Sequence, residues 1–201
     1  MFSVPDQEPD GRAAAEHRGL VEHGHHIESR LDLTAPVVVG GQPDIAGSGV
    51  LIEPVAEDAD EATCRIVDAF FVERLQEAPD SREGGGNMPY EVFRAFVSDP
   101  WQALLAREFG SGELVGITCL VPRGDAPHRL NTGFTGVRPD RRGAGLSALL
   151  KSEHAVRARA AGWQEYLTQN MDGNAPILAI NQRLGFRPVG GSRDYGWALT
   201  S

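Results

Sequence analysis

The stretch TGVRPDRRGAGLSALLK, residues 135–151, decides the fold. Its apolar start predicts a strand that ends at Val137, and the glycines at 143 and 145 predict a turn directly before a helix. Glycine lets the backbone approach a ligand closely, and the free N–H groups at a helix start attract anions. With Arg141 and Arg142 beside it, we expect this turn to bind a phosphate group. The alternative is a tight connection with solvated arginines.

A second informative stretch, TQNMDGNAPILAINQRLGF, spans residues 168–186. Asn174 is expected to cap a helix that has Pro176 in its first turn, and Gly185 is expected to end it. Apolar side chains at helical spacing predict one buried face, formed by Ile177, Ile180 and Leu184.

The two stretches together resemble the signatures of the GNAT superfamily of acyl-CoA N-acyltransferases. The family's cofactor motif has Arg or Gln, two residues, Gly, one residue and then Gly or Ala, after Val-x-Pro. Residues 137–139 and 142–147 correspond to it, with Ser147 at the last position. The second signature has an Asn that opens a helix and a Gly-Phe after it, and the residues in register are Asn174, Asn181, Leu184, Gly185 and Phe186. The resemblance covers residues 48–201.

This resemblance implies an α/β (α+β) GNAT fold, which is a mixed, splayed sheet of six or seven strands with helices on both faces. It implies acetyl-CoA as the acyl donor, with pantetheine in the opening of the sheet and the pyrophosphate on the N–H groups of residues 142–147. The cofactor-binding residues that it implies are Thr135, Gly136, Val137, Arg142, Gly143, Ala144, Gly145, Leu146, Ser147 and Asn174.

The family reaction is direct transfer of an acyl group from the thioester to an amine in a ternary complex. The amine must lose a proton, the oxyanion needs a donor such as an N–H near Val137, and the CoA thiolate takes up a proton. Many members use a tyrosine as that acid, where this chain has Asn181, and a carboxamide is no acid at neutral pH. The catalytic candidates are Tyr166, Asn170 and Asn181. Tyr195 could replace the acid, the thiolate could leave unaided, or the site could be inactive.

Residues 48–201 are expected to form the acyltransferase domain, and residues 1–47 an N-terminal extension. The extension predicts a short helix, a turn at Gly19, a strand ending near Leu33 and a Pro/Gly-rich linker. It faintly repeats the C-terminus, and so resembles the last strand of a first domain, as in tandem acyltransferases such as mycothiol synthases. Such a strand must pair with its own sheet or with that of a homodimer partner. A mobile tail is the alternative.

Two further segments carry expectations about buried and exposed positions. ELVGITCLV, residues 113–121, is apolar on both alternating faces, which predicts a central strand that is buried on both sides. Lys151 lies one turn inside the cofactor helix, and it is expected either to be solvated or to reach the 3′-phosphate of CoA. The acceptor is expected at the loop around residues 79–97.

Composition excludes several classes of function. A formal net charge of −9 over 201 residues argues against a nucleic acid partner. Residues 1–100 hold 20 acidic and 7 basic side chains, an excess that could attract a cationic substrate or serve only to keep the protein soluble. No apolar run is long enough to span a membrane, so the expected location is the cytoplasm. No metal site is expected, and the cysteines and the clustered histidines are interpreted as reduced core residues and solvated side chains; they are Cys64, Cys119, His17, His23, His25 and His26.

The sequence therefore predicts an acetyl-CoA-dependent N-acetyltransferase that acts on a primary amine of a small molecule, as a monomer or homodimer. Two alternatives stay open. One is a non-catalytic acyl-CoA-binding or sensor domain, which the asparagine at position 181 favours. The other is one half of a tandem acyltransferase assembly, which the N-terminal repeat favours.

Overall fold

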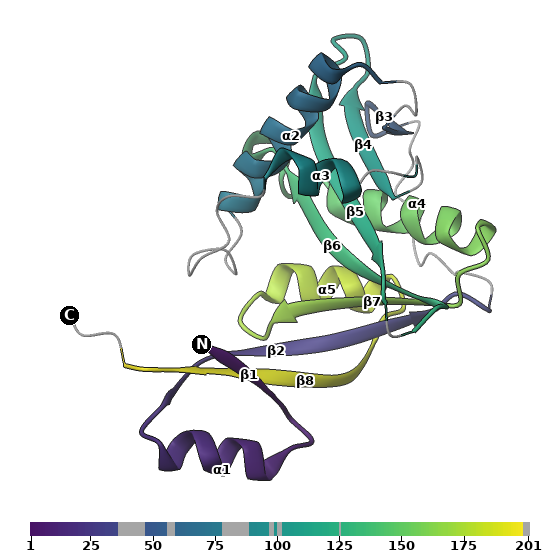
Figure 1. Ribbon diagram of the computed structural model, residues 1–201. Coiled ribbons are helices and arrows are strands. Elements are labelled where there is room, and N and C mark those ends of the chain that lie inside the picture. Colours follow the sequence, from purple (N-terminus) through teal and green to yellow (C-terminus); the bar gives the residue numbers. More distant parts are fainter. Residues whose placement is uncertain are drawn as a thin grey trace.

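The computed structural model describes residues 1–35, 47–55, 59–77, 89–96, 99, 102–124 and 126–198. These residues form one eight-stranded sheet in the order β1-β8-β2-β7-β6-β5-β4-β3 (Figure 1). The strands are β1 (Phe2–Pro5), β2 (Val21–Asp32), β3 (Val50–Pro54), β4 (Ala103–Glu108), β5 (Leu114–Pro122), β6 (Arg129–Val137), β7 (Glu165–Met171) and β8 (Arg187–Gly196). The helices are α1 (Pro9–His17), α2 (Glu61–Gln76), α3 (Tyr90–Phe96), α4 (Leu146–Ala160) and α5 (Ala175–Arg183), with a 3-10 helix at Pro139–Arg141.

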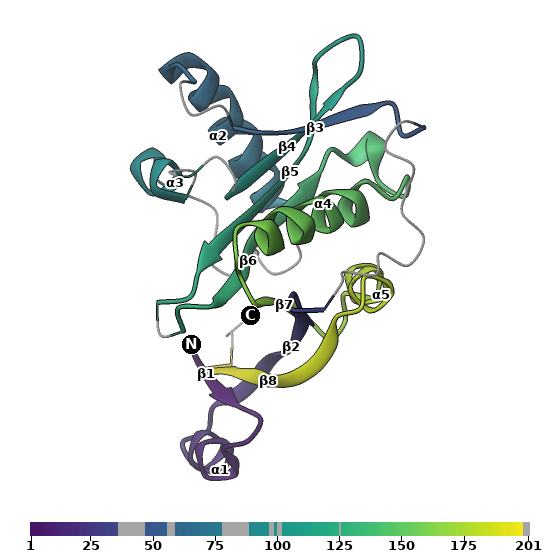
Figure 2. The same cartoon turned by 90° about the vertical axis from the view of Figure 1, so that its right-hand side faces the viewer.

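Helices cover both faces of the sheet (Figure 2). On one face α2 and α3 pack against β4, β5 and β6, and this cluster is centred on Val67, Phe71 and Phe93. On the other face the apolar side chains of α4 pack against β3, β4 and β5. A third cluster joins the end of α4 to β7 and to the residues that follow α5. The predicted α/β fold with helices on both faces is confirmed.

The sheet opens between β6 and β7. These two strands are parallel, and they pair only from Arg129 with Glu165 to Asn131 with Leu167. Beyond that point β6 continues to Val137 and β7 to Met171 without pairing to each other, and the two ribbons diverge (Figure 1). The predicted splay is therefore present, and it leaves one edge of β6 without a neighbouring strand.

β5 lies in the interior of the sheet, between β4 and β6. Its residues from 115 to 120 are all buried, as the two apolar faces of this segment predict. Among the described residues, no helix combines the length and the apolar character that crossing a membrane requires.

The N-terminal strand is part of the same sheet. β2 lies between β7 and β8 and pairs antiparallel with both, and β1 pairs with the outer side of β8. The sheet thus has eight strands instead of the six or seven predicted, because the extension contributes two. The predicted strand ending near Leu33 pairs within its own chain. The linker proposed before residue 48 lies largely outside the described residues, and the division at 47/48 stays a prediction.

Candidate functional site

The glycine turn between β6 and α4 is open and uncapped. Gly143 and Gly145 have φ of 78° and 81°, in the left-handed region that favours glycine. A Cβ built on either residue would meet no atom within 4 Å. Gly145 is the N-cap residue of α4 and offers no side-chain capping bond to the helix. The turn can therefore receive an anion at the positive end of the α4 dipole.

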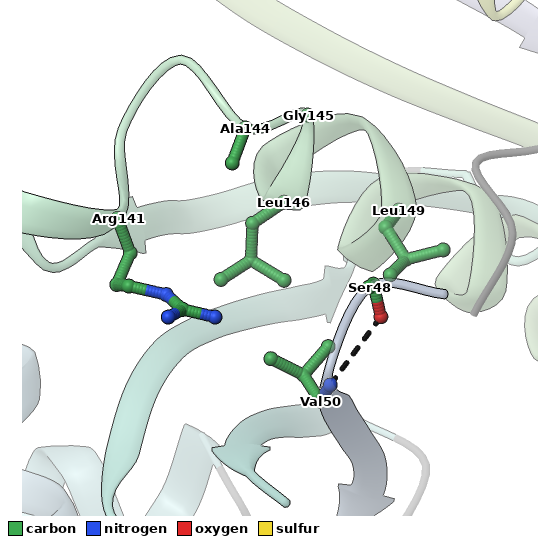
Figure 3. Close-up of a pocket in the computed structure, with 7 residues that line it drawn as sticks. All are labelled: Ser48, Val50, Arg141, Ala144, Gly145, Leu146 and Leu149. Carbon is green, nitrogen blue, oxygen red and sulfur yellow. Dashed lines mark hydrogen bonds between the residues drawn. The ribbon is translucent and has the colours of Figure 1, made fainter. Parts of the chain in front are cut away.

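A pocket lies beside this turn, between the start of α4 and β3 (Figure 3). The guanidinium of Arg141 extends along it toward the side chain of Leu146. The lining is otherwise apolar, apart from one hydroxyl group. The residues that form it are Ser48, Val50, Arg141, Ala144, Gly145, Leu146 and Leu149.

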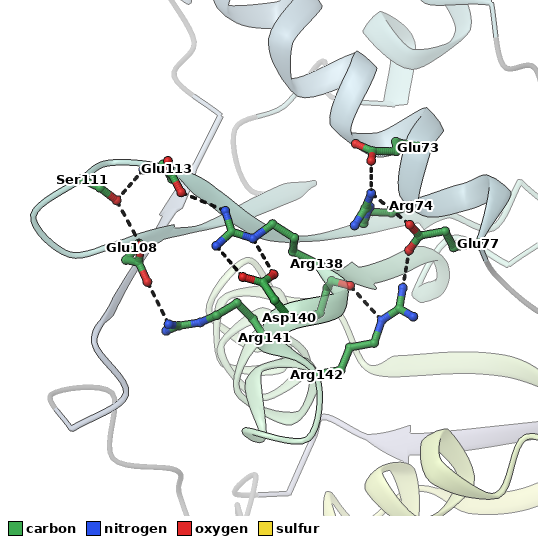
Figure 4. Close-up of polar contacts among 11 residues, drawn as sticks. Glu73, Arg74, Glu77, Glu108, Ser111, Glu113, Arg138, Asp140, Arg141 and Arg142 are labelled. Atoms are coloured by element: carbon green, nitrogen blue, oxygen red, sulfur yellow. Dashed lines mark hydrogen bonds and ion pairs between the residues drawn. The ribbon is translucent and has the colours of Figure 1, made fainter.

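The arginines of the turn are paired with carboxylates (Figure 4). Arg138 donates to Asp140 at 2.7 Å and to Glu113 at 2.9 Å, and its hydrogen bond lowers the pKa of the Asp140 carboxyl. Arg141 donates to Glu108 at 2.8 Å. The alternative interpretation, a tight connection whose arginines are only solvated, does not describe Arg138 and Arg141, because Glu113 before β5 and Glu108 of β4 pair with them.

Glu77, directly after α2, lies between two arginines (Figure 4). Its carboxylate contacts Arg142 of the turn and lies 3.1 Å from Arg74 of α2. Arg74 also contacts Glu73, yet its Nε and Nη1 are buried and have no hydrogen-bond partner. A buried guanidinium with two unsatisfied donors is costly, so this corner favours additional anionic or carbonyl ligands.

The free edge of β6 leads into the glycine turn. The residues after Asn131 pair with β5 on one side and lack a strand on the other. A bulge between Thr132 and Phe134 bends the strand there. Unpaired backbone N–H and C=O groups on such an edge can bind an extended ligand that carries amides.

Thr135, Gly136 and Val137 form the end of this edge. Thr135 Oγ1 lies 2.9 Å from Thr118 Oγ1 of β5. A Cβ on Gly136 would come within 2.8 Å of Arg74 Cβ, so only glycine allows α2 to pack this closely on β6. Val137 is buried against α4. The structure thus brings the predicted pantetheine-binding segment and the predicted pyrophosphate-binding turn into one continuous surface.

Two of the three catalytic candidates contact each other. Asn181 Nδ2 donates to Asn170 Oδ1 at 2.9 Å, and Thr168 Oγ1 donates to the same oxygen at 3.3 Å. Asn181 is 2% exposed, and its Oδ1 is buried without a hydrogen-bond partner. Asn174 stands at the N-cap of α5, but its side chain makes no capping hydrogen bond. The sequence placed Asn174 correctly and predicted its capping bond wrongly.

Tyr166 lies in the core. Its side chain is fully buried and its ring meets Phe186 edge to face, with the centroids 5.0 Å apart. Thr132 Oγ1 lies 3.3 Å from the tyrosine hydroxyl. Burial raises the pKa of Tyr166 above its ordinary value, which disfavours the role of proton donor.

Sequence reasoning misplaced Lys151 and missed its partner Thr168. The lysine is 1% exposed, so it is neither solvated nor available to a 3′-phosphate. Its amine donates to Thr168 Oγ1 at 3.2 Å. No signal of this burial was present in the sequence, because a lysine on a helix is normally solvated.

Two of the four histidines predicted to be solvated, His25 and His26, have carboxylate partners, whereas His17 is exposed as predicted. His25 lies between Asp6 and Asp172, with contacts of 3.0 and 3.2 Å, and these raise its pKa, the bond to Asp6 most. His26 lies 2.9 Å from Asp194. These pairs fix β1, β2 and β8 to one another, and their members are too distant in sequence for spacing to reveal them.

Solved structures with a similar fold are known, although no family model and no curated protein matches the sequence itself. Among solved structures, a GCN5-related N-acetyltransferase from Sphaerobacter thermophilus matches with a TM-score of 0.73 at 18% identity, over 96% of this chain and 57% of that one. A tandem GNAT protein from the clavulanic acid biosynthesis pathway matches with a TM-score of 0.68 at 20% identity, over 96% of this chain and 62% of that one.

A third structure, a GCN5-related N-acetyltransferase from Kribbella flavida, matches with a TM-score of 0.67 at 16% identity, over 98% of this chain and 68% of that one. This chain thus spans less than two thirds of the length of the first two structures. At these identities the likeness shows the fold. The chain has the fold of the GCN5-related N-acetyltransferases.

Proposed function

Given that fold, we propose that the chain is an acetyl-CoA-dependent N-acetyltransferase that acts on a primary amine of a small molecule. One observation carries the proposal: the free edge of β6 runs directly into the uncapped start of α4 at a glycine turn. Pantetheine amides would bind along that edge, and the pyrophosphate would bind at the turn. The residues proposed to hold acetyl-CoA are Thr135, Gly136, Val137, Arg142, Gly143, Ala144, Gly145, Leu146, Ser147 and Asn174.

The proposed reaction is attack of a neutral amine on the thioester carbon within a ternary complex. N–H groups on the free edge of β6 would stabilise the oxyanion. The carbon–sulfur bond then breaks and its electron pair leaves with sulfur as CoA thiolate, while the proton lost by the amine goes to solvent. We propose that the amine approaches past residues 79–97, of which 79–88 and 97 lie outside the described residues. The acidic first half of the chain supports a cationic acceptor.

Free-thiol release tests this function. Purified protein, acetyl-CoA and a panel of polyamines, aminoglycosides and short peptides would be incubated together, and release of CoA thiol would be followed over time. Thiol release that depends on one amine class supports the enzyme and identifies its acceptor. Binding of acetyl-CoA without release across the panel would instead support the sensor domain or the half of a tandem assembly.

The carboxylate of Glu77 gives a prediction about cofactor affinity. Glu77 pairs with Arg142, and a CoA phosphate that binds Arg142 would have to replace this carboxylate. Glu77→Gln is therefore expected to tighten acetyl-CoA binding by about 2- to 5-fold, the range of a partly exposed ion pair. Calorimetric titration would measure this. Glu73→Gln is the matched control, because Glu73 contacts Arg74 but not Arg142. Weaker binding by the Glu77 variant would contradict the idea that a CoA phosphate replaces the Glu77 carboxylate at Arg142.

A further inference from the structure

Lys151 is the only lysine in the chain, and it is fully buried on α4. Its amine lies 5.1 Å from the centre of the Phe186 ring and 5.6 Å from that of Tyr166. Burying an ammonium group is expensive unless its environment compensates for the lost hydration. Two aromatic rings and one hydroxyl provide part of that compensation. A cation retained at such cost is a candidate for a functional role.

A directional chain of hydrogen bonds connects this amine to Asn181. Lys151 donates to Thr168, Thr168 donates its single hydroxyl proton to Asn170 Oδ1, and Asn181 Nδ2 donates to the same oxygen. Because both donors converge on the Asn170 carbonyl oxygen, the amide nitrogen of Asn170 is directed away from them. The network therefore fixes the orientation of both carboxamides.

This network extends from the core to the opening of the sheet. Side chains alternate along a strand, so Tyr166, Thr168 and Asn170 share one face of β7. Tyr166 and Thr168 are buried, and Asn170 is partly exposed. The last residue of β7 paired with β6 is Leu167, so the two polar residues lie where the strands separate. Asn181 occupies the position at which the family resemblance places a tyrosine acid.

We propose that Lys151 is a positioning residue, whose buried positive charge stabilises the departing CoA thiolate through Thr168, Asn170 and Asn181. This rests on the proposed acyl transfer and adds to it. The electron pair of the broken carbon–sulfur bond stays on sulfur, no proton leaves Lys151, and Asn170 provides N–H donors toward the thiolate. The chain thereby needs no tyrosine acid at position 181.

The protonation of Lys151 is expected to depend on a nearby anion, because the side chains that contact its amine, within the part of the chain that the structure describes, carry no carboxylate. Burial lowers the pKa of the lysine to about 7, so its charge changes within the neutral range. The titratable neighbours are Tyr166 on β7, whose pKa is raised by burial, and His154 on α4 itself. The other described side chains in contact with the amine are Thr168 of β7 and Phe186 before β8, which are uncharged. A thiolate would therefore raise the pKa of Lys151, and the charged lysine would lower the pKa of the thiol. The two ionisation constants would change by the same factor.

A single isotope-labelled lysine tests this coupling without knowledge of the acceptor. Protein grown with ¹³C,¹⁵N-lysine gives one side-chain NMR signal, which is titrated with pH for the free protein, with CoA and with desulfo-CoA, which lacks the sulfur. The thiolate of bound CoA is expected to raise the pKa of Lys151, with about a tenfold change in the ionisation constant of the lysine. Desulfo-CoA is expected to leave this pKa near its value in the free protein. Equal titrations with both ligands would overturn the proposal.

Variants provide the reciprocal measurement. The pKa of the bound CoA thiol, followed by the ultraviolet absorbance of the thiolate, is expected to rise in Lys151→Met and in Thr168→Val. This corresponds to an ionisation constant that is smaller by about tenfold. Thr168→Ser, which keeps the hydroxyl, should retain the wild-type value. If Lys151→Met fails to fold, Thr168→Val and the labelled lysine decide. An unchanged thiol pKa in variants that bind CoA normally overturns the role of Lys151 alone, whereas absence of CoA binding to wild-type protein overturns the proposed function and this inference together.

Discussion

Gly145→Trp is expected to weaken acetyl-CoA binding by at least about 100-fold while the protein stays folded. Gly145 has φ of 81°, and nothing lies within 4 Å of a Cβ placed there, so a large side chain would extend into the space in front of the α4 start. That is the space proposed for the pyrophosphate. A non-glycine residue with this backbone conformation costs roughly 1–2 kcal/mol of stability, which a folded domain usually tolerates. Calorimetry would measure affinity, and thermal unfolding would measure stability.

The opposite end of the same helix provides the control. Gly162 follows α4, has φ of 89° and is equally free of neighbours within 4 Å of a Cβ. Gly162→Trp therefore introduces the same backbone cost and the same bulk, far along the helix from the glycine turn. It should lower the free energy of unfolding to a similar extent and leave acetyl-CoA affinity intact. Equal affinities for the two tryptophan variants would show that the turn does not bind the cofactor.

Lys151→Met is expected to stabilise the fold more at pH 6 than at pH 9. Burial lowers the lysine pKa from 10.5 in the unfolded chain to about 7. Below pH 7 the amine is charged in both states, so the folded protein bears the full cost of the buried charge. Between pH 7 and 10.5 only the unfolded chain stays protonated, and this cost declines as pH rises. Methionine removes the charge with a side chain of similar length.

Lys151→Met is expected to raise the free energy of unfolding relative to wild type, and this gain should be larger at pH 6 than at pH 9 by on the order of 2–3 kcal/mol. Loss of the Thr168 hydrogen bond and of the ring contacts lowers the gain at both pH values, but it does not alter this pH dependence. Urea unfolding of both proteins at each pH would measure it. A gain that is independent of pH would mean that the amine titrates near its ordinary value.

Local patterns were sufficient to predict the parts of the site that are built from consecutive residues. The glycines at 143 and 145 indicated a strand–turn–helix unit, and both have the left-handed conformation that such a turn requires. The apolar faces of residues 113–121 indicated the buried β5. Each of these features depends on backbone preferences or on the periodicity within one element.

Long-range pairing accounts for what the sequence did not reveal. β2 enters the sheet between β7 and β8, and Glu77 reaches Arg142 from a different helix. Spacing carries no information about such contacts, because the partners are brought together only by the complete fold. The burial of Lys151 was missed for a related reason, since a lysine is normally solvated and only its packing against β7 removes it from water.

Calorimetric titration of the wild-type protein with acetyl-CoA tests the central claim most directly, because every step of the proposed function requires the cofactor at the edge of β6 and the start of α4. We predict saturable binding of one acetyl-CoA per chain, which weakens as salt concentration rises and is lost in Gly145→Trp but not in Gly162→Trp. Absence of a binding heat together with absence of ligand-induced thermal stabilisation would contradict the account.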